Sequence, residues 1–314
     1  MAQSLGLVFC GTPRFAVPTL DRLVEAAGFD VQLVVTQPDR PKGRGLELVP
    51  SPVKQRALEL ELPIAQPERI KNNEEFQSRL TLLRPDAIIV VGYGRIIPQW
   101  MLDLPPVGNI NLHASLLPKY RGAAPIQWAI ARGETVTGVT TMKIDGGLDT
   151  GDILLQLEIA IAGDDTAETL APKLAAPGAD LMVETLRGLQ AGAILPLPQD
   201  NSKVTLAPIL KKEDGLIQFL SGPEEILNRL RGFQPWPGAY CKFRNKILQI
   251  RKAAKVNRTL APAEIEVEGD RLFVGCGQGG AIEILELQLE GKKRTFAAEF
   301  IRGYRPKPAE RLTS

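Results

Sequence analysis

Histidine is almost absent from this sequence of 314 residues, which contains a single one, His113. Only three cysteines occur, and they are widely spaced: Cys10, Cys241 and Cys276. So few imidazole and thiolate ligands cannot assemble the common zinc sites, and an odd number of scattered cysteines does not support a disulfide framework. We therefore expect a protein without a metal, in a reducing compartment, the cytoplasm.

Long apolar runs are lacking as well. No stretch approaches the roughly 18 consecutive apolar residues that a membrane span needs, and the first residues show no basic region of a signal peptide. Hydrophobic residues make up 44% of the chain and charged residues 24%, which is ordinary for a globular protein. We expect a chain without membrane association, and its length predicts two domains.

Charge is distributed unevenly along the chain. Residues 208–314 contain 19 Lys and Arg against 13 Asp and Glu, a net charge of +6, whereas residues 1–207 have a net charge of −4. Between Glu225 and Glu264 nine basic residues occur without an acidic one, and aromatic residues lie among them. Such a stretch is either a solvated strand edge protected by basic residues or a surface for nucleic-acid phosphates.

The order of apolar runs predicts the fold of the first two thirds. Strand-like runs alternate with stretches of helical spacing; they occupy residues 5–10, 31–36, 86–91 and 108–112. This alternation predicts a Rossmann-like α/β domain with a mostly parallel sheet, which binds ligands at the carboxyl ends of its strands. The first turn lacks G-x-G-x-x-G, which disfavours a nicotinamide or flavin dinucleotide.

The remainder predicts a second domain of another kind. A helix is expected over 165–191, broken or kinked at Pro177 and Gly178. Several short strands follow residue 208, which favours a small OB-like β-barrel. The predicted division is therefore 1–191 for the first domain, 192–207 for a proline-rich linker and 208–314 for the second domain.

Polar residues gather around the single histidine. Asn111 and His113 end a predicted strand, and strand alternation places both on one face with Leu112 on the other. An isolated histidine is more often a hydrogen-bonded core residue than a catalyst. A pair of polar residues at the carboxyl end of a central strand, however, favours a ligand-binding or catalytic site over a core histidine.

Two loops are also candidates for function. Residues 142–152 contain three Asp and three Gly, but the spacing of an EF-hand is missing, so the alternatives are simple turns or a role for Asp149. Residues 37–52 form a long basic Pro/Gly-rich stretch with Arg40, Lys42 and Arg44. Such loops are either functional or merely solvated.

These residues resemble the folate-dependent formyltransferases. The resemblance rests on Asn111-x-His113-x-Ser115-Leu116-Leu117-Pro118, on Asp149 in a Leu-Asp-Thr-Gly loop 36 residues after His113, and on the segment that starts at Arg121. The motifs at 9–13, 36–45 and 235–237 narrow the resemblance to one member of that group, the methionyl-tRNA formyltransferase family. The similarity covers essentially the whole chain.

The resemblance implies a reaction and a set of roles. A formyl group would pass from 10-formyltetrahydrofolate to the α-amine of initiator methionyl-tRNA, with no metal. Asn111 would stabilise the oxyanion, His113 would hydrogen-bond the intermediate or move a proton, and Asp149 would hold the imidazole.

The resemblance also implies two sets of binding residues. The folate pocket would be lined by two segments, from which we select Ser115, Leu116, Leu117, Pro118, Tyr93, Arg95 and Ile97. The tRNA would be bound by the 37–52 loop and the second domain, through Arg40, Lys42, Arg44, Lys242, Arg244, Lys246 and Arg251. We expect a monomer.

Two alternatives remain open at the level of sequence. The chain could formylate an amino-sugar nucleotide or hydrolyse formyltetrahydrofolate, but neither reaction needs the basic stretch. It could also be a nucleic-acid-binding protein with an inactive α/β half, although such a relic would not need Asn111, His113 and Asp149 together.

Overall fold

The computed structural model describes residues 4–42 and 47–313. The chain divides into two compact units, which we describe separately. The N-terminal unit comprises 1–125, 136–160 and 171–208, and the C-terminal unit comprises 126–135, 161–170 and 209–314.

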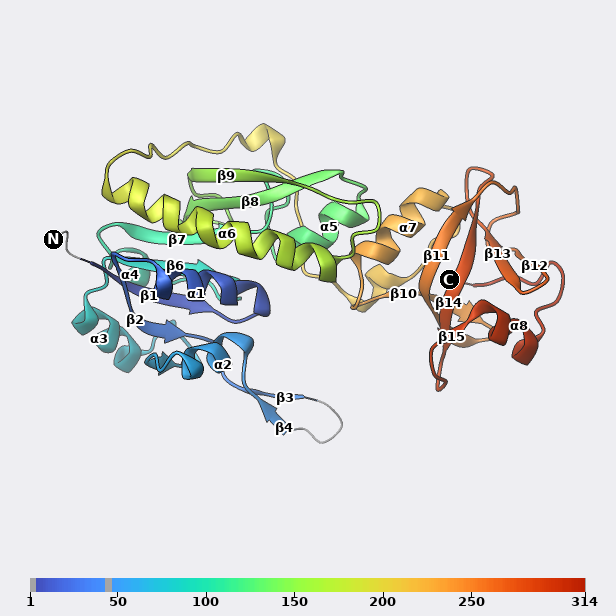
Figure 1. Cartoon of the computed structure of the whole chain (residues 1–314), viewed down its shortest axis with the longest axis horizontal. Coiled ribbons are helices and arrows are strands. Elements are labelled where there is room, and N and C mark those ends of the chain that lie inside the picture. The colour runs from blue at the N-terminus through green and yellow to red at the C-terminus, as the bar shows by residue number, and fades with distance from the viewer. Residues whose placement is uncertain (1–3, 43–46, 314) are drawn as a thin grey trace. The chain divides into compact units, whose positions relative to one another are not determined.

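Seven strands form the sheet of the N-terminal unit, in the order β5-β2-β1-β6-β7-β8-β9 (Figure 1). The first five are parallel to one another, β8 runs antiparallel to β7, and β9 runs antiparallel to β8. Their bounds are β1 Leu5–Gly11, β2 Phe29–Val35, β5 Ile64–Ala65, β6 Ala87–Val91, β7 Gly108–His113, β8 Val136–Lys143 and β9 Ile153–Ala160. Every residue of β1 and β6 is buried, as expected for strands covered on both faces.

Helices cover this sheet. Figure 1 shows α1 and α6 side by side on one face, where Arg22 of α1 donates a hydrogen bond to Asp180 of α6. Apolar side chains of α3 and α4 pack in one core cluster with alternate residues of β1, β2 and β6. The helices of this unit are α1 Val17–Glu25, α2 Pro52–Glu59, α3 Glu74–Leu83, α4 Gln99–Leu102 and, from residue 171 on, α6 Ala167–Gln190; α5 Pro125–Ala131 belongs to the C-terminal unit after its first residue.

Helix α6 corrects one expectation. It runs for 24 residues without interruption, although Pro172 and Pro177 lie inside it. Proline removes one helical hydrogen bond and normally kinks or ends a helix. Here Leu174, Leu181 and Leu186 bury an apolar stripe, and this burial keeps the segment helical. The predicted break at Pro177 and Gly178 is therefore wrong, whereas the alternative, a kink there, stays a prediction.

The segment 192–207 is held against the N-terminal sheet. Leu197 forms a bridge with Ile153 of β9, and Leu206 forms one with Arg121. A single 3₁₀ turn, Asn201–Lys203, lies between the two bridges. This segment therefore has fixed partners within the unit, although its composition is that of a linker.

An antiparallel sheet forms the core of the C-terminal unit. Its strand order is β10-β11-β14-β13-β12, and β15 pairs with β14. The elements are α7 Pro223–Gly232, β10 Ala239–Phe243, β11 Lys246–Val256, β12 Ile265–Glu268, β13 Arg271–Gly275, β14 Ala281–Leu289, β15 Thr295–Phe296 and α8 Ala297–Tyr304. The predicted fold class, a mostly parallel α/β domain followed by a small OB-like β domain, is confirmed. No described helix has the length and apolarity to cross a membrane.

Candidate active site

Strand β7 brings Asn111 and His113 to one face at its carboxyl end. The intervening Leu112 points to the other face, toward α6, where a Cβ on Gly178 would lie 3.0 Å from it. β7 is flanked by β6 and β8, with Asn111 opposite Val90 on one side and His113 opposite Thr140 on the other. The pair therefore occupies an interior strand, at the edge where parallel sheets bind ligands.

Both ring nitrogens of His113 face oxygen atoms. Nε2 lies 2.9 Å from the Tyr120 carbonyl, and Nδ1 lies 3.7 Å from Oδ2 of Asp149. Because a carbonyl oxygen only accepts, Nε2 carries the proton of the neutral ring. The Nδ1 distance exceeds a hydrogen bond, so Asp149 acts on the imidazole through its charge. The residue is 6% exposed, which weakens solvent screening of that charge.

A close turn presents Asp149 to the imidazole. Asp149 has φ 51°, in the left-handed region, and its Oδ2 accepts a 2.8 Å hydrogen bond from the Gly122 amide. Gly122 also has positive φ, 122°, and a Cβ there would lie 2.6 Å from the Ala207 carbonyl. The three predicted catalytic residues thus gather at one strand end. Their roles remain predictions.

The turn after His113 is fixed by buried hydrogen bonds. Thr140 Oγ1 donates to the Ser115 carbonyl at 2.6 Å and accepts from Leu117 N at 3.2 Å. Gln156 Nε2 donates to the Leu117 carbonyl at 2.9 Å. The Ser115 hydroxyl donates to the Lys119 carbonyl, and Leu116 and Pro118 are half-buried. A turn with this many contacts is a rigid surface for a ligand.

The 93–97 segment contains two buried residues, the half-buried Arg95 and the exposed Ile96. Tyr93 and Ile97 belong to the apolar core, and burial raises the pKa of the Tyr93 phenol well above its ordinary value. Within the described residues, the Tyr93 hydroxyl and Arg95 Nε are buried without a hydrogen-bond partner. A buried guanidinium N–H left unpaired is a donor that a ligand rich in acceptors, such as folate, would satisfy. Its part in folate binding remains a prediction.

The basic loop of the N-terminal unit is only partly described. β3 (Arg40–Lys42) pairs with β4 (Glu47–Val49) in a two-stranded ribbon, on which Arg40 is exposed. Arg44 lies outside the described residues, and for Lys42 only the backbone is described. At the base of the ribbon Lys54 pairs with Asp39 and lowers the pKa of that carboxyl.

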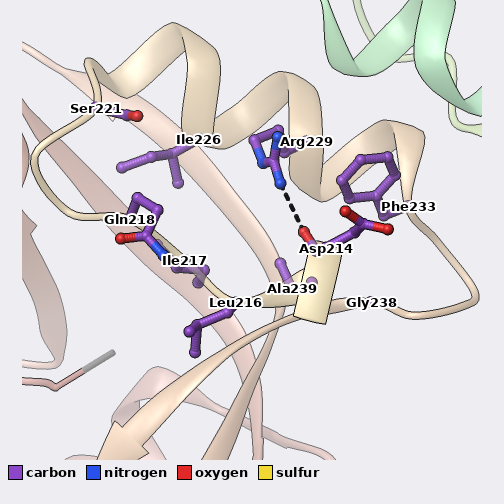
Figure 2. A pocket seen from close by; sticks show the side chains of 11 residues that line it. Asp214, Leu216, Ile217, Gln218, Ser221, Ile226, Arg229, Phe233, Gly238 and Ala239 are labelled. Atoms are coloured by element: carbon purple, nitrogen blue, oxygen red, sulfur yellow. Dashed lines mark hydrogen bonds between the residues drawn. The ribbon is translucent and has the colours of Figure 1, made fainter. Parts of the chain in front are cut away.

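Most residues of the basic stretch interact with the protein itself. Arg229 donates to the Asp214 carbonyl across a small pocket beneath α7 (Figure 2). Arg231 donates to the Asp165 carbonyl. Arg244, Lys255 and Arg258 pair with acids that lie elsewhere in the sequence, namely Glu310, Glu224, Glu266 and Glu268. Although the stretch itself contains no acidic residue, most of its basic side chains are therefore paired with groups from other segments of the chain.

Three lysines of this stretch remain exposed. Within the described residues Lys242, Lys246 and Lys252 form no ion pair. Lys242 and Lys246 lie on the β10–β11 hairpin, and Lys252 lies further along β11. Arg251 is half-buried and donates to Gln288. Of the predicted tRNA contacts, Lys242 and Lys246 have the accessible charge that phosphate binding needs, whereas Arg244 and Arg251 are engaged.

Gln199 is a site residue that the sequence did not reveal. Its side chain donates to the carbonyls of Asp149 and Gly151, 50 and 48 residues earlier in the chain. A glutamine in a proline-rich segment carries no local signal for such a contact. Nowhere in 4–42 and 47–313 do three or more His, Cys, Asp or Glu side chains form a group that could hold a metal ion.

Known families match both units. The formyl transferase family matches residues 6–186, and the formyl transferase C-terminal domain matches residues 209–305. The chain is 66% identical over 306 residues to methionyl-tRNA formyltransferase of Koribacter versatilis, covering 98% of both chains. It is 60% identical over 308 residues to methionyl-tRNA formyltransferase of Acidobacterium capsulatum, covering 98% of this chain and 99% of the relative.

Solved structures share the fold at low identity. The N-formyltransferase of Helicobacter canadensis, in complex with folinic acid and dTDP-3-aminofucose, matches with a TM-score of 0.65 at 19% identity, covering 88% of this chain and 98% of that one. HypX of Aquifex aeolicus, in complex with tetrahydrofolic acid, matches with a TM-score of 0.59 at 17% identity. That match covers 99% of this chain, which spans about half of HypX.

Proposed function

The chain belongs to the methionyl-tRNA formyltransferase family, and we propose that it transfers the formyl group of 10-formyltetrahydrofolate to the α-amine of initiator methionyl-tRNA. The observation that carries the proposal is the meeting of Asn111, His113 and Asp149 at the carboxyl end of β7. Relatives named for methionyl-tRNA reach 66% identity, whereas the sugar formyltransferase neighbour shares only the fold. The sugar and hydrolase alternatives are therefore not favoured.

The chemistry of the acceptor explains why these residue types suffice. An α-amine titrates near pH 7.7–8.0, so about a tenth or more is neutral at pH 7 and needs no strong base. Its attack on the formyl carbon places negative charge on the formyl oxygen and positive charge on nitrogen. The Asn111 amide is a donor for that oxygen, an effect worth about 2.7–4 kcal/mol in comparable sites.

His113 carries the proton in this proposal. The Tyr120 carbonyl holds Nε2–H, which leaves the Nδ1 lone pair to take the proton from the attacking nitrogen. The Asp149 carboxylate, 3.7 Å from Nδ1, then stabilises the positive ring. His113 returns the proton to the folate nitrogen as the C–N bond to the formyl carbon breaks. General acid–base transfer of this kind contributes about 10²–10⁴-fold.

We propose a division of labour between the two parts of the chain. Residues 1–191 would bind folate, through the Ser115–Pro118 turn and the 93–97 segment, and carry out transfer. Residues 208–314 would bind the tRNA body, with Lys242, Lys246 and Lys252 as the exposed contacts, and the 37–52 loop would approach the acceptor stem. The enzyme would act as a monomer in the cytoplasm, where its thiols stay reduced.

The test follows release of tetrahydrofolate from 10-formyltetrahydrofolate. Reactions contain charged initiator tRNA, charged elongator methionine tRNA, a dTDP-amino-sugar or buffer alone, with His113→Ala as the inactive control. Release with initiator tRNA alone is expected. Release in buffer would identify a hydrolase, and release only with the amino-sugar would identify a sugar formyltransferase; either result would overturn the proposal.

A further inference from the structure

Gln199 uses both ends of its amide to join two segments of the site. Nε2 donates to the Asp149 carbonyl at 2.9 Å and to the Gly151 carbonyl at 2.7 Å. Oε1 accepts from Arg121, at 3.0 Å from Nε and 2.7 Å from Nη2. No other residue type of this length offers two donors and an acceptor in one plane. The contacts therefore depend on glutamine itself.

The two segments that Gln199 joins are the ones that face His113. Asp149 supplies the carboxylate toward Nδ1, and Tyr120, adjacent to Arg121, supplies the carbonyl toward Nε2. Both residues have positive φ, 51° and 63°. Non-glycine residues persist in this conformation where the surroundings hold them. Gln199 hydrogen-bonds the carbonyl of Asp149 itself and the side chain of Arg121, the residue after Tyr120.

Arg121 holds the Gln199 side chain in place between the two segments. The residue is 6% exposed, and Nη2 also donates to Asn201 Oδ1 at 3.1 Å. Its main chain pairs with the same segment, because Arg121 N donates to the Thr205 carbonyl and Ala207 N donates to the Arg121 carbonyl. A buried guanidinium costs free energy unless its N–H groups are bonded, which fixes Gln199 in this rotamer.

We propose that Gln199 is a positioning residue for the reaction, which sets Asp149 and the Tyr120 carbonyl at their places on the His113 ring. The inference deepens the proposed function and rests on it, because it assigns the 192–207 segment a part in transfer. Gln199 itself touches no reacting atom. It acts through the backbone on either side of the imidazole.

Three substitutions test the hydrogen bonds of the amide, and one of them, Gln199→Glu, separates its two ends. Gln199→Ala removes both, whereas Gln199→Met keeps the length without hydrogen bonds. Gln199→Glu keeps the acceptor for Arg121 but sets a carboxylate against the carbonyls of Asp149 and Gly151. Gln190→Ala, at an exposed glutamine that ends α6, is the matched control.

Steady-state formylation should show a loss in kcat alone. We expect all three Gln199 variants to lower kcat by about 10- to 100-fold, as for misplaced supporting residues, with the KM for each substrate within about two-fold. Gln190→Ala should match the wild type. Gln199→Ala should cost less in an Asp149→Asn background than in the wild type, because the part of its effect that passes through the Asp149 carboxylate is already lost. Unchanged kcat in Gln199→Ala, or additive losses in the double variant, would overturn the inference.

A spectroscopic reading separates this inference from the proposed function. The chain has one histidine, so untagged protein gives one imidazole Hε1 resonance in ¹H NMR. That resonance should move in the Gln199 variants but not in Gln190→Ala. If the wild type failed to formylate tRNA while the resonance moved, the function would fail and the positioning would stand. If Gln199→Ala did not fold, Gln199→Met would decide, and an unmoved resonance would contradict the inference.

Discussion

The His113 site and the basic surface of the C-terminal unit are built in opposite ways. His113 is 6% exposed, and each of its nitrogens faces one oxygen at a set distance. Lys242, Lys246 and Lys252 are exposed side chains that carry the same charge and are not held in ion pairs within the described residues. A buried polar site depends on every partner, because none can be replaced by water. A phosphate-binding surface sums small, screened contributions.

This difference predicts how each region responds to substitution. In the buried site a single change should remove most of the activity and leave tRNA binding intact. On the basic surface a single change should alter affinity slightly and leave the transfer step intact.

The largest effect is expected for His113→Ala. It removes the group that moves the proton, so kcat should fall by about 10²–10⁴-fold, with the Kd for charged tRNA unchanged. Rapid-quench formylation and filter binding measure the two quantities. A kcat within about three-fold of the wild type would show that the imidazole carries no catalytic proton.

Two asparagines of β7 provide an internal comparison. Asn111→Ala should lower kcat by about 10²–10³-fold, as loss of an oxyanion donor does elsewhere. Asn109 instead donates to the carbonyls of Met101 and Leu102, so Asn109→Ala should lower Tm while folded protein keeps its kcat. Equal kcat losses in the two variants would remove Asn111 from its proposed role.

A moderate effect is expected from the lysines. Replacing Lys242, Lys246 and Lys252 together by Ala should flatten the plot of log K against log salt by about two to three units, because each phosphate contact contributes nearly one. Arg244→Ala is the matched control: its guanidinium bonds Glu310, so the change should lower Tm and barely alter the slope. An unchanged slope in the triple variant would place the tRNA elsewhere.

The smallest effect is expected for the thiols. Burial raises the pKa of Cys276 to about 11, and the pKa values of Cys10 and Cys241 are also raised by burial. A raised pKa keeps the thiol neutral below it, so at pH 8 about one Cys276 thiol in a thousand is ionised. Iodoacetamide at pH 8 should leave activity intact. Rapid inactivation with labelling of one of these cysteines would contradict this.

The features that could be predicted from the sequence are those that depend on the local periodicity of apolar and polar residues. The placement of Asn111 and His113 on one face of β7 follows from alternation, and Leu112 lies on the other face as predicted. The fold class followed from alternating strands and helices. The uninterrupted α6 was missed, because burial of its apolar stripe outweighs Pro177, and this balance is set by tertiary packing.

Contacts between distant segments could not be predicted. The acid-free run around β10 and β11 suggested an unpaired surface, yet Arg244 meets Glu310, 66 residues later. Gln199 reaches Asp149 across 50 residues, and its proline-rich surroundings indicated only a linker. Both contacts arise from tertiary pairing, which leaves no periodic trace in the chain.

We expect substitutions in the two regions to separate formyl transfer from tRNA binding. Single-turnover formylation at saturating charged initiator tRNA, measured for His113→Ala and for the triple lysine variant alongside the tRNA Kd, decides this. His113→Ala should lose the transfer rate at a normal Kd, and the lysine variant should keep a normal rate at a raised Kd. A rate and an affinity that fell together in both variants would contradict it.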